Sequence, residues 1–389
     1  MNRTRWDSLS PLVLGTSASQ ALLVVLAPTV VAIGEDLGAS VATVGQARSV
    51  TAAVAITVSV VLSTRPTGWP VPRLLQVGGL LAVLACATVA ATASVGTFLA
   101  AHVLVGVAFA LLLSGGFGGL GSFEGADRAW AAGHVAAANA LAWVVVNPVA
   151  AWLTAAWSWR SAQAVPAAIA VVAVLTARRA APVAATGAAG SGRRWAALTE
   201  RSARRWVVAE TAAFTAWTAL LTFAGAYFIQ RTAADEGTVG WLLAAGAGAY
   251  LLTSTRSGLF ARLLAGRTLV AAAAAVMGLL MPLMFTVSST RAGAVVAFCL
   301  LGLLAGIRTP ASARLGLEQL PGRPAAMMAT RTAATQLGYL LGAVAGGTLI
   351  AVSGYRALGL ALGAVMVLSA ALVLRVADPP GAEAPRGPG

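Results

Sequence analysis

The sequence contains no lysine and few other ionisable residues, with 26 arginines, 12 acidic residues and two histidines among 389. Charged residues make up 10% of the chain, whereas about a quarter of a typical soluble protein is charged. Without lysine there is no Walker-type phosphate loop, and no HExxH motif, nucleophile elbow or acidic metal cluster occurs either. These absences argue against an ATPase or a hydrolase, and the sequence predicts no enzyme activity, cofactor or metal site.

Long apolar segments take the place of the missing charge. Hydrophobic residues form 59% of the chain, and the mean hydropathy is +0.84. A membrane-spanning helix needs about 20 mostly apolar residues. The pattern predicts an all-α membrane protein with twelve transmembrane helices in two pseudo-symmetric six-helix bundles. The predicted spans are residues 12–33, 41–62, 72–92, 96–118, 129–151, 161–178, 206–229, 239–260, 268–288, 292–313, 325–350 and 354–375.

One polar stretch interrupts the apolar pattern near the middle of the chain. Residues 177–206 contain seven arginines and Glu200, separated mostly by Ala, Gly, Ser, Thr and Pro. Such a segment can neither cross a bilayer nor form a core, so it is interpreted as a solvated linker. The expected parts are a six-helix bundle (1–178), an Arg-rich cytoplasmic linker (179–205), a second bundle (206–376) and a disordered cytoplasmic tail (377–389).

The distribution of arginine predicts the orientation in the membrane. With the N-terminus inside, eighteen arginines fall in cytoplasmic segments, four in outer loops and four within spans. Such an excess on the inner side is typical of cytoplasmic loops, and the acidic outer loops at 35–36 and 235–236 agree with it. We expect a multi-pass protein of the plasma (inner) membrane with both termini cytoplasmic. We also expect a monomer that contacts lipid and a small-molecule substrate but no nucleic acid.

The two halves resemble each other. When the chain is shifted by 196 residues, the turn Ser158-Trp159-Arg160 falls on Gly354-Tyr355-Arg356, and Gly106 falls on Gly302. Parallel six-helix repeats give a shift of about half the chain, and their interface near the bilayer midplane is where such proteins bind substrate. Gly338, Gly342 and Gly346 form a GxxxGxxxG ridge that predicts close helix packing.

Four charged residues of the second half lie at similar depth, in the inner thirds of their predicted helices. An ion within a span costs roughly 2.5–3.5 kcal/mol at the helix centre, so each needs a partner or a function. The residues are Glu210, Arg256, Arg308 and Arg331. They predict an ion-pair cluster at the cytoplasmic mouth with a positive excess. That excess could be neutralised by lipid headgroups, could close a gate, or could hold an anionic substrate group.

The clearest polar face lies on the fifth predicted helix. Asn139, Trp143 and Asn147 are spaced four residues apart and share one side, and Pro148 frees a backbone carbonyl beside them. Two amides and an indole suit a substrate wall, although interhelical hydrogen bonding is the plainer explanation. Arg48, about seven residues into the second helix, either joins this wall or extends toward the outer interface.

Further cavity candidates are polar or aromatic residues of three other predicted helices. Gln20 lies in the first helix, Thr215 and Trp217 in the seventh, and Gln336 and Tyr339 in the eleventh. A threonine within a helix can also satisfy its hydroxyl on its own backbone, so Thr215 alone is a weak indication of a binding site.

Several motifs together resemble the major facilitator superfamily over essentially the whole chain, and within it the twelve-helix bacterial drug:proton antiporter branch. They are Gly15-Thr16 with APTVVAIGEDLGASVATVGQ (27–46), Ser158-Trp159-Arg160, and QLGYLLGAVAGGTLIAVSGYRALG (336–359). The resemblance implies alternating access between two bundles, export of a substrate, multidrug resistance and proton antiport.

The sequence departs from this family at several functional positions. The loop 63–73 lacks the usual acidic residue, loop 258–267 has Arg262 in place of Asp, His102 replaces an Arg before Gly106, Asn147-Pro148 replaces Gly-Pro, and Ala18 or a neighbour replaces an acidic residue. Glu210 is then the only carboxylate within a predicted span. It and His102 are the leading candidates for proton coupling.

The sequence therefore favours a secondary-active transporter that exports a small amphipathic or aromatic molecule. One alternative is an organic-anion transporter that uses the intramembrane arginines. The other is a non-transporting membrane receptor derived from a transporter, which the altered loops suggest.

Overall fold

The computed structural model is α-helical and describes residues 3–64, 69–183, 199–256, 264, 266–287, 290–319 and 324–377. Most of the expected linker (184–198), all but the first residue of the expected tail (377–389) and Arg262 lie outside these described residues. The helices of the first half are α1 Arg3–Val24, α2 Leu26–Asp36, α3 Val41–Thr64, α4 Val71–Ala90, α5 Val95–Gly118, η1 Gly119–Ser122, α6 Gly125–Ala156, α7 Trp159–Ala162, α8 Ala164–Thr176 and η2 Ala177–Arg179. Those of the second half are α10 Arg201–Thr232, α11 Glu236–Ser254, α13 Gly266–Pro282, the π-helical η4 Leu283–Val287, α14 Arg291–Gln319 and α15 Pro324–Leu374.

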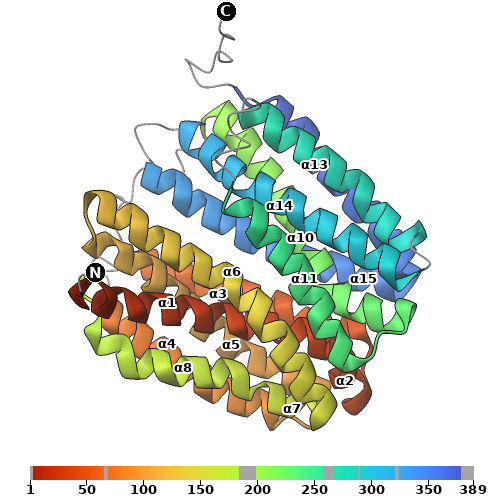
Figure 1. The fold of residues 1–389 in the computed structure, drawn as a ribbon, viewed down its shortest axis with the longest axis horizontal. Helices are drawn as coiled ribbons and strands as arrows, with labels where there is room; N and C mark the ends of the chain where they lie inside the picture. The colour runs from red at the N-terminus through yellow and green to blue at the C-terminus, as the bar shows by residue number, and fades with distance from the viewer. Residues whose placement is uncertain are drawn as a thin grey trace, which may run out of the picture. The chain divides into compact units, whose positions relative to one another are not determined.

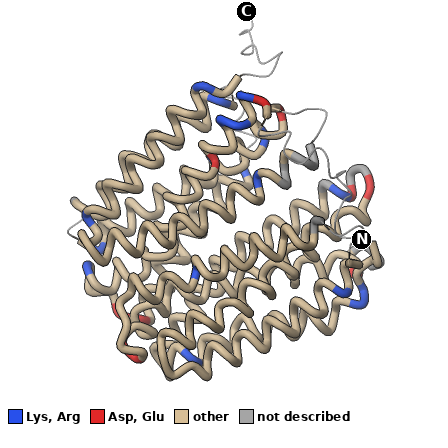
Figure 2. Tube along the Cα trace, turned by 180° about the vertical axis from the view of Figure 1, so that it is seen from behind, with Lys and Arg blue, Asp and Glu red and all other residues tan. Residues whose placement is uncertain are grey.

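Ten helical stretches among the described residues are long and apolar enough to cross a membrane. The longest, at 330–374, is interrupted at Gly354, whose φ of 73° and ψ of −174° are not helical. Glycine adopts positive φ without the steric cost that other residues meet, so the chain can turn there. The chain is therefore a multi-pass membrane protein, and Figure 2 shows its charged residues gathered mainly at helix ends, with long uncharged stretches between.

The first predicted helix, 12–33, is two helices rather than one. α1 ends at Val24 and α2 begins at Leu26, with Val25 between them. Pro28 has no N–H to donate to the carbonyl four residues earlier, which is the usual cause of such a break. The hydroxyl of the next residue, Thr29, donates to the Val25 carbonyl at 2.7 Å.

The seventh predicted helix begins earlier than expected, at Arg201 rather than residue 206. Ala203 and Trp206 are buried in a cluster with Leu315 and Val373, and this burial stabilises the added turn. Arg205 on the same turn donates to the Arg375 carbonyl at 2.9 Å.

The contacts divide the chain into two compact units. The first contains Met1–Ala188 and Leu221–Ala245, and the second contains Ala189–Leu220 and Gly246–Gly389. Within the first unit, α1 packs against α4, α5, α6 and α8, which run alongside it in Figure 1. Within the second unit, α13 packs against both α14 and α15.

Glycine contacts recur in equivalent places in the two units. Gly106 of α5 lies against α3, where an added Cβ would come within 2.8 Å of the Thr51 carbonyl oxygen. Gly302 of α14 lies in the same way against the Gly246 carbonyl of α11. In one unit, α5 (the fourth predicted span) thus packs on α3 (the second). In the other, α14 (the tenth) packs on α11 (the eighth), which supports the internal repeat.

A second pair follows the same rule. Gly79 of α4 lies against Ala170 and Val174 of α8, and Gly278 of α13 lies against the carbonyl of Gly363 in α15. In the order of the predicted spans, these contacts place the third span against the sixth and the ninth against the twelfth. Close backbone approach at small residues is a main source of helix association in lipid.

The glycine ridge of α15 also packs as predicted. An added Cβ at Gly338 would lie 2.6 Å from the Phe214 Cβ, and one at Gly342 would meet the Thr215 carbonyl. Both contacts are with α10, so the prediction of close packing is confirmed for these two positions.

Gly302→Ala should destabilise the protein, because the new methyl group would meet the Gly246 backbone carbonyl. Overpacking of this kind costs about 1–3 kcal/mol. Gly248→Ala on α11 is the matched control, since no atom lies within 4 Å of its added Cβ and alanine is the better helix former. Thermal unfolding in detergent should show a lower Tm for Gly302→Ala and an unchanged or higher Tm for Gly248→Ala. Equal melting of the two variants would contradict the packing described here.

Candidate functional site

Four polar side chains from three helices of the first unit form a group that we call the indole cluster. Its members are Gln20 of α1, Arg48 of α3, and Trp143 and Asn147 of α6. The Trp143 Nε1 donates to Gln20 Oε1 at 3.3 Å, and the Arg48 guanidinium carbon lies 5.7 Å from the indole centroid. The structure thus brings together four of the residues singled out on the sequence.

Apolar contacts hold the indole in place. Trp143 packs against a buried cluster of Ala21, Val24, Ala142 and Val146. The indole therefore has an apolar body in a helix interface and a polar N–H directed at an amide. This combination is common in binding sites for flat organic molecules.

Arg48 is almost fully buried, at 2% exposure, so of the two alternatives for this residue the one in which it extends to the outer interface is wrong. Its Nη2 donates to the Leu23 carbonyl at 2.7 Å. Leu23 lies in the last turn of α1, two residues before the break at Val25. A carbonyl oxygen beside this break thus provides part of the site that holds the guanidinium.

The third polar residue of the α6 face, Asn139, lies two turns before Asn147. Its Oδ1 is buried and has no hydrogen-bond partner, and the same holds for the Oδ1 of Asn147. Buried polar atoms are nearly always paired, so two unpaired acceptors on one face call for an explanation. Each atom can still accept a hydrogen bond.

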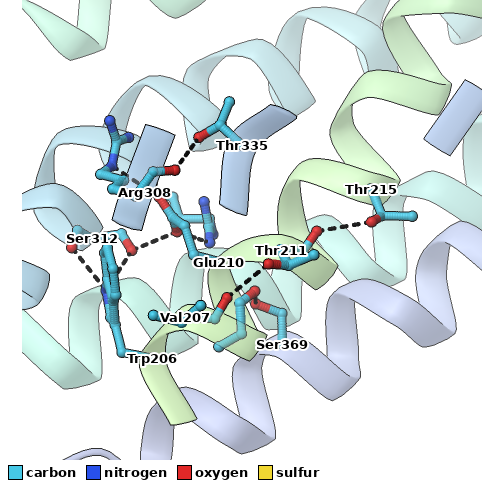
Figure 3. A network of polar contacts seen from close by, with 11 residues as sticks. Trp206, Val207, Glu210, Thr211, Thr215, Arg308, Ser312, Thr335 and Ser369 are labelled. Carbon is cyan, nitrogen blue, oxygen red and sulfur yellow. Dashed lines mark hydrogen bonds and ion pairs between the residues drawn. The ribbon is translucent and has the colours of Figure 1, made fainter. Parts of the chain in front are cut away.

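The second unit contains a buried ion network, the Glu210 network, consisting of Glu210, Arg308, Ser312 and Arg331. Figure 3 labels the first three. The Glu210 carboxylate is fully buried. Its Oε2 accepts from Arg308 Nη2 and from Ser312 Oγ, each at 2.7 Å, and its Oε1 accepts from Arg331 Nε at 3.2 Å. Three helices, α10, α14 and α15, meet at this one carboxylate.

The network carries two guanidinium groups for one carboxylate. The Arg308 side chain is 4% exposed and its Nε has no hydrogen-bond partner, whereas the Arg331 side chain is 19% exposed. Arg331 also lies 5.8 Å from the centroid of the Phe214 ring. Arg308 is therefore the fixed cation, and Arg331 is the one with access to surrounding space.

Two further residues, neither of them predicted from the sequence, support the network. The Trp206 Nε1 donates to the backbone carbonyl of Ser312 at 3.0 Å, and the Ser369 hydroxyl donates to the Ala209 carbonyl at 2.7 Å (Figure 3). Ser312 itself was also missed, although it lies one helical turn after Arg308 and so faces the same direction. The four-residue spacing from Arg308 was the sequence pattern that could have identified Ser312.

Arg256 lies apart from the predicted charge cluster. It is exposed just beyond the end of α11, and its Nη1 donates to the carbonyl of Leu252 at 2.9 Å. Of the four charges expected together, the structure unites Glu210, Arg308 and Arg331 only. The grouping was predicted from depth in the membrane, and depth does not give the direction in which a side chain points.

The remaining cavity candidates of the second unit lie on α10 and α15. Thr215 donates its hydroxyl to the Thr211 carbonyl at 2.8 Å, and Trp217 is half-buried. Gln336 is buried with its Oε1 unpaired, and the Tyr339 ring lies 6.1 Å from that of Phe214. The hydroxyl of Thr215 is thus satisfied on its own helix.

His102 is buried in α5. Its Nδ1 lies 2.8 Å from the Phe98 carbonyl, which can only accept, so this nitrogen carries the proton. Its ring also lies 4.5 Å from that of Phe98. A packed imidazole bonded to its own helix suits a structural role, and a role in proton transfer stays a prediction.

A further set of hydrogen bonds, which was not predicted from the sequence, joins loops at one end of the first unit. The Asp36 Oδ2 accepts from Arg160 Nη1 at 2.6 Å and from Trp159 Nε1 at 3.1 Å, and Arg160 Nη2 donates to the Thr92 carbonyl at 3.0 Å. The acidic outer loop and the Trp-Arg turn, which were noted separately on the sequence, are thus bonded to each other.

Comparison with protein-family models matches residues 206–389 to the Major Facilitator Superfamily. The search of curated proteins found no match to the chain. The matched residues include Glu210, Arg308 and Arg331, and the match points to a transporter rather than an enzyme.

Glu210→Gln should lower stability strongly, because it leaves two buried or partly buried cations without their anion. Removing one partner of a buried ion pair typically costs about 3–5 kcal/mol. Arg331→Gln should cost less, since Arg331 is the more exposed partner and Arg308 would still neutralise the carboxylate. Thermal unfolding followed by tryptophan fluorescence would test this order. A Glu210→Gln protein that melts at the wild-type temperature would show that the network contributes little.

Proposed function

From the membership of residues 206–389 in the Major Facilitator Superfamily, a family of secondary transporters, we propose that this chain exports a small amphipathic or aromatic molecule by alternating access. In this proposal the moving parts are two six-helix bundles, residues 1–178 and 206–376, joined by a cytoplasmic linker. The indole cluster is the observation that carries the proposal, because it provides an aromatic surface and amide groups inside a membrane-spanning bundle.

Twelve spans would complete these two bundles. Ten candidate spans, the interruption of α15 at Gly354, and the 19-residue helix α11 are together consistent with twelve. Exposed tryptophans support the expected interfacial position of two helix ends. Trp152, Trp157 and Trp241 are 57%, 67% and 68% exposed, and they lie at the ends of α6 and α11 that the arginine distribution places outside. Tryptophan is enriched at membrane–water interfaces.

Proton antiport is the proposed energy source, with Glu210 as the residue that takes up the proton. In the arrangement described above, two guanidinium groups and a hydroxyl all favour the charged carboxylate. Protonation would leave two uncompensated cations, so it requires that one of them move away. Arg331 is the residue that can do so, because it is the partly exposed partner and it lies on a different helix from Arg308.

Transport of an organic anion is the second candidate, and the positive excess of the Glu210 network favours it. The buried Arg308 Nε without a partner could donate to a carboxylate or phosphate group. This candidate predicts that anions bind best and that salt weakens their binding.

Binding of a chemically sorted panel should separate the two candidates. We expect neutral aromatic molecules to raise the Tm of the purified protein, and this effect should survive Arg331→Gln. Arg256→Ala is the matched control, since Arg256 is exposed and, among the described residues, its side chain donates to the Leu252 carbonyl of its own helix. Stabilisation by anions alone, lost in Arg331→Gln and kept in Arg256→Ala, would favour the anion transporter instead.

Flux in proteoliposomes should show coupling to protons. With wild-type protein, adding a stabilising compound on one side should move protons in the opposite direction, as reported by an internal pH dye. Glu210→Gln, where it folds, should still bind the compound but move no protons. Proton movement that persists in Glu210→Gln would rule out Glu210 as the coupling residue. Binding without any flux of the compound would favour a receptor.

A further inference from the structure

We propose that the transported molecule is an uncharged, flat compound with N–H or O–H groups, and that Asn147 Oδ1 accepts a hydrogen bond from it. This inference rests on the proposed function, because it assigns the chemistry of the substrate at the indole cluster. It follows from the donors and acceptors of the cluster and from its charge.

The orientation of the Asn147 amide is fixed by its neighbour. Its Nδ2 lies 2.7 Å from the Trp143 backbone carbonyl, which can only accept a hydrogen bond. An amide oxygen in that place would set two acceptors against each other, so the NH2 group must be there. The Oδ1 of Asn147 consequently points elsewhere, buried and without a partner in a residue that is 1% exposed.

The Gln20 amide is oriented by the same logic. An indole N–H can only donate, so the atom that it meets at 3.3 Å must be Gln20 Oε1. This oxygen is therefore occupied. The acceptors that remain unpaired on the α6 face are Asn147 Oδ1 and Asn139 Oδ1, two turns apart. A ligand can satisfy them only by donating.

The charge of the cluster disfavours cations. Apart from Arg73 and Arg178 at span ends, Arg48 is the only charged residue within a predicted span of the first half, and it is buried with its guanidinium carbon 5.7 Å from the Trp143 ring centroid. A cationic ligand stacked on that indole would lie close to a buried guanidinium, and the repulsion is weakly screened there. A carboxylate, in turn, would bring its oxygens toward the unpaired amide oxygens. An uncharged donor avoids both conflicts.

An unpaired buried acceptor makes such a site selective. A site built to hydrogen-bond a ligand discriminates strongly against an analogue that lacks the group, because its own polar atom is then left unpaired. We expect at least a tenfold preference for a donor-bearing ligand over its methylated analogue.

The test uses purified full-length protein and probes built on the same rings. Benzamide, 2-naphthamide and 9-anthracenecarboxamide supply donors, and their N,N-dimethyl forms do not. 2-Naphthoate is the anion and 2-naphthyltrimethylammonium the cation. Dissociation constants come from quenching of tryptophan fluorescence. At least one primary amide should bind at least tenfold more tightly than its dimethyl form and than either ion.

Asn147→Leu should reduce the amide preference to within about threefold. Its Tm without ligand should equal or exceed that of wild type, since the substitution removes an unpaired buried acceptor. A purely structural amide would instead lower the Tm and leave the preference unchanged. Thr154→Val on the same helix is the matched control, because the Thr154 hydroxyl is already bonded to the Ala150 carbonyl at 2.8 Å. This variant should keep the preference.

Wild-type protein alone decides the matter if Asn147→Leu fails to fold. Equal binding of the primary and dimethyl amides, tightest binding by either ion, or no binding of any amide at millimolar concentration would overturn the inference. Failure of the proposed function is distinguishable from this. Selective binding without flux would contradict transport and leave the inference intact. Flux of both amides at equal apparent affinity would support transport and contradict the inference.

Discussion

A polar group in the hydrocarbon core of a bilayer has no water to bind, so its partners must come from the protein or from a bound molecule. Most hydroxyls of the described spans meet this requirement on their own helix, as Thr88, Thr154 and Thr176 do by donating to carbonyls four residues earlier. The carboxylate of Glu210 cannot be satisfied so locally. It collects donors from α14 and α15. The amide oxygens of Asn139 and Asn147 depart from this constraint, as do Arg308 Nε and Gln336 Oε1 in the second unit.

The lipid environment also determines how the helices associate with one another. Apolar side chains gain little by leaving lipid for a protein interface, so close backbone packing supplies much of the attraction. The glycines at 106 and 302, and those at 79 and 278, place equivalent helix pairs in contact in the two units. This agreement is stronger support for an internal repeat than sequence similarity among Ala- and Val-rich segments, because each contact requires a small residue at one particular face.

The sequence was sufficient for the class of fold, since hydropathy alone predicts long apolar helices. It was less informative about helix ends and breaks. Pro28 indicated a break, but the apolar run continued through it and was predicted as one helix. Side-chain periodicity showed which residues of α6 share a face, yet not which neighbour that face meets. The bond between Gln20 and Trp143 joins residues 123 positions apart, and only the packing of α1 against α6 creates it. Arg256 and Arg308 show the same limit, because residues at similar depth can face in different directions.

The contacts between α10 and α15 are of two kinds with different consequences for motion. The close packing at Gly338 and Gly342 involves small residues and backbone, and it has no directional bonds to break when one helix shifts along the other. The ion pair of Arg331 with Glu210 is directional and fixes the register of the two helices. A proton on Glu210 would weaken that pair and leave the glycine contact in place. The arrangement therefore suits a helix that is held by charge in one state and released to slide in the other, without loss of its packing.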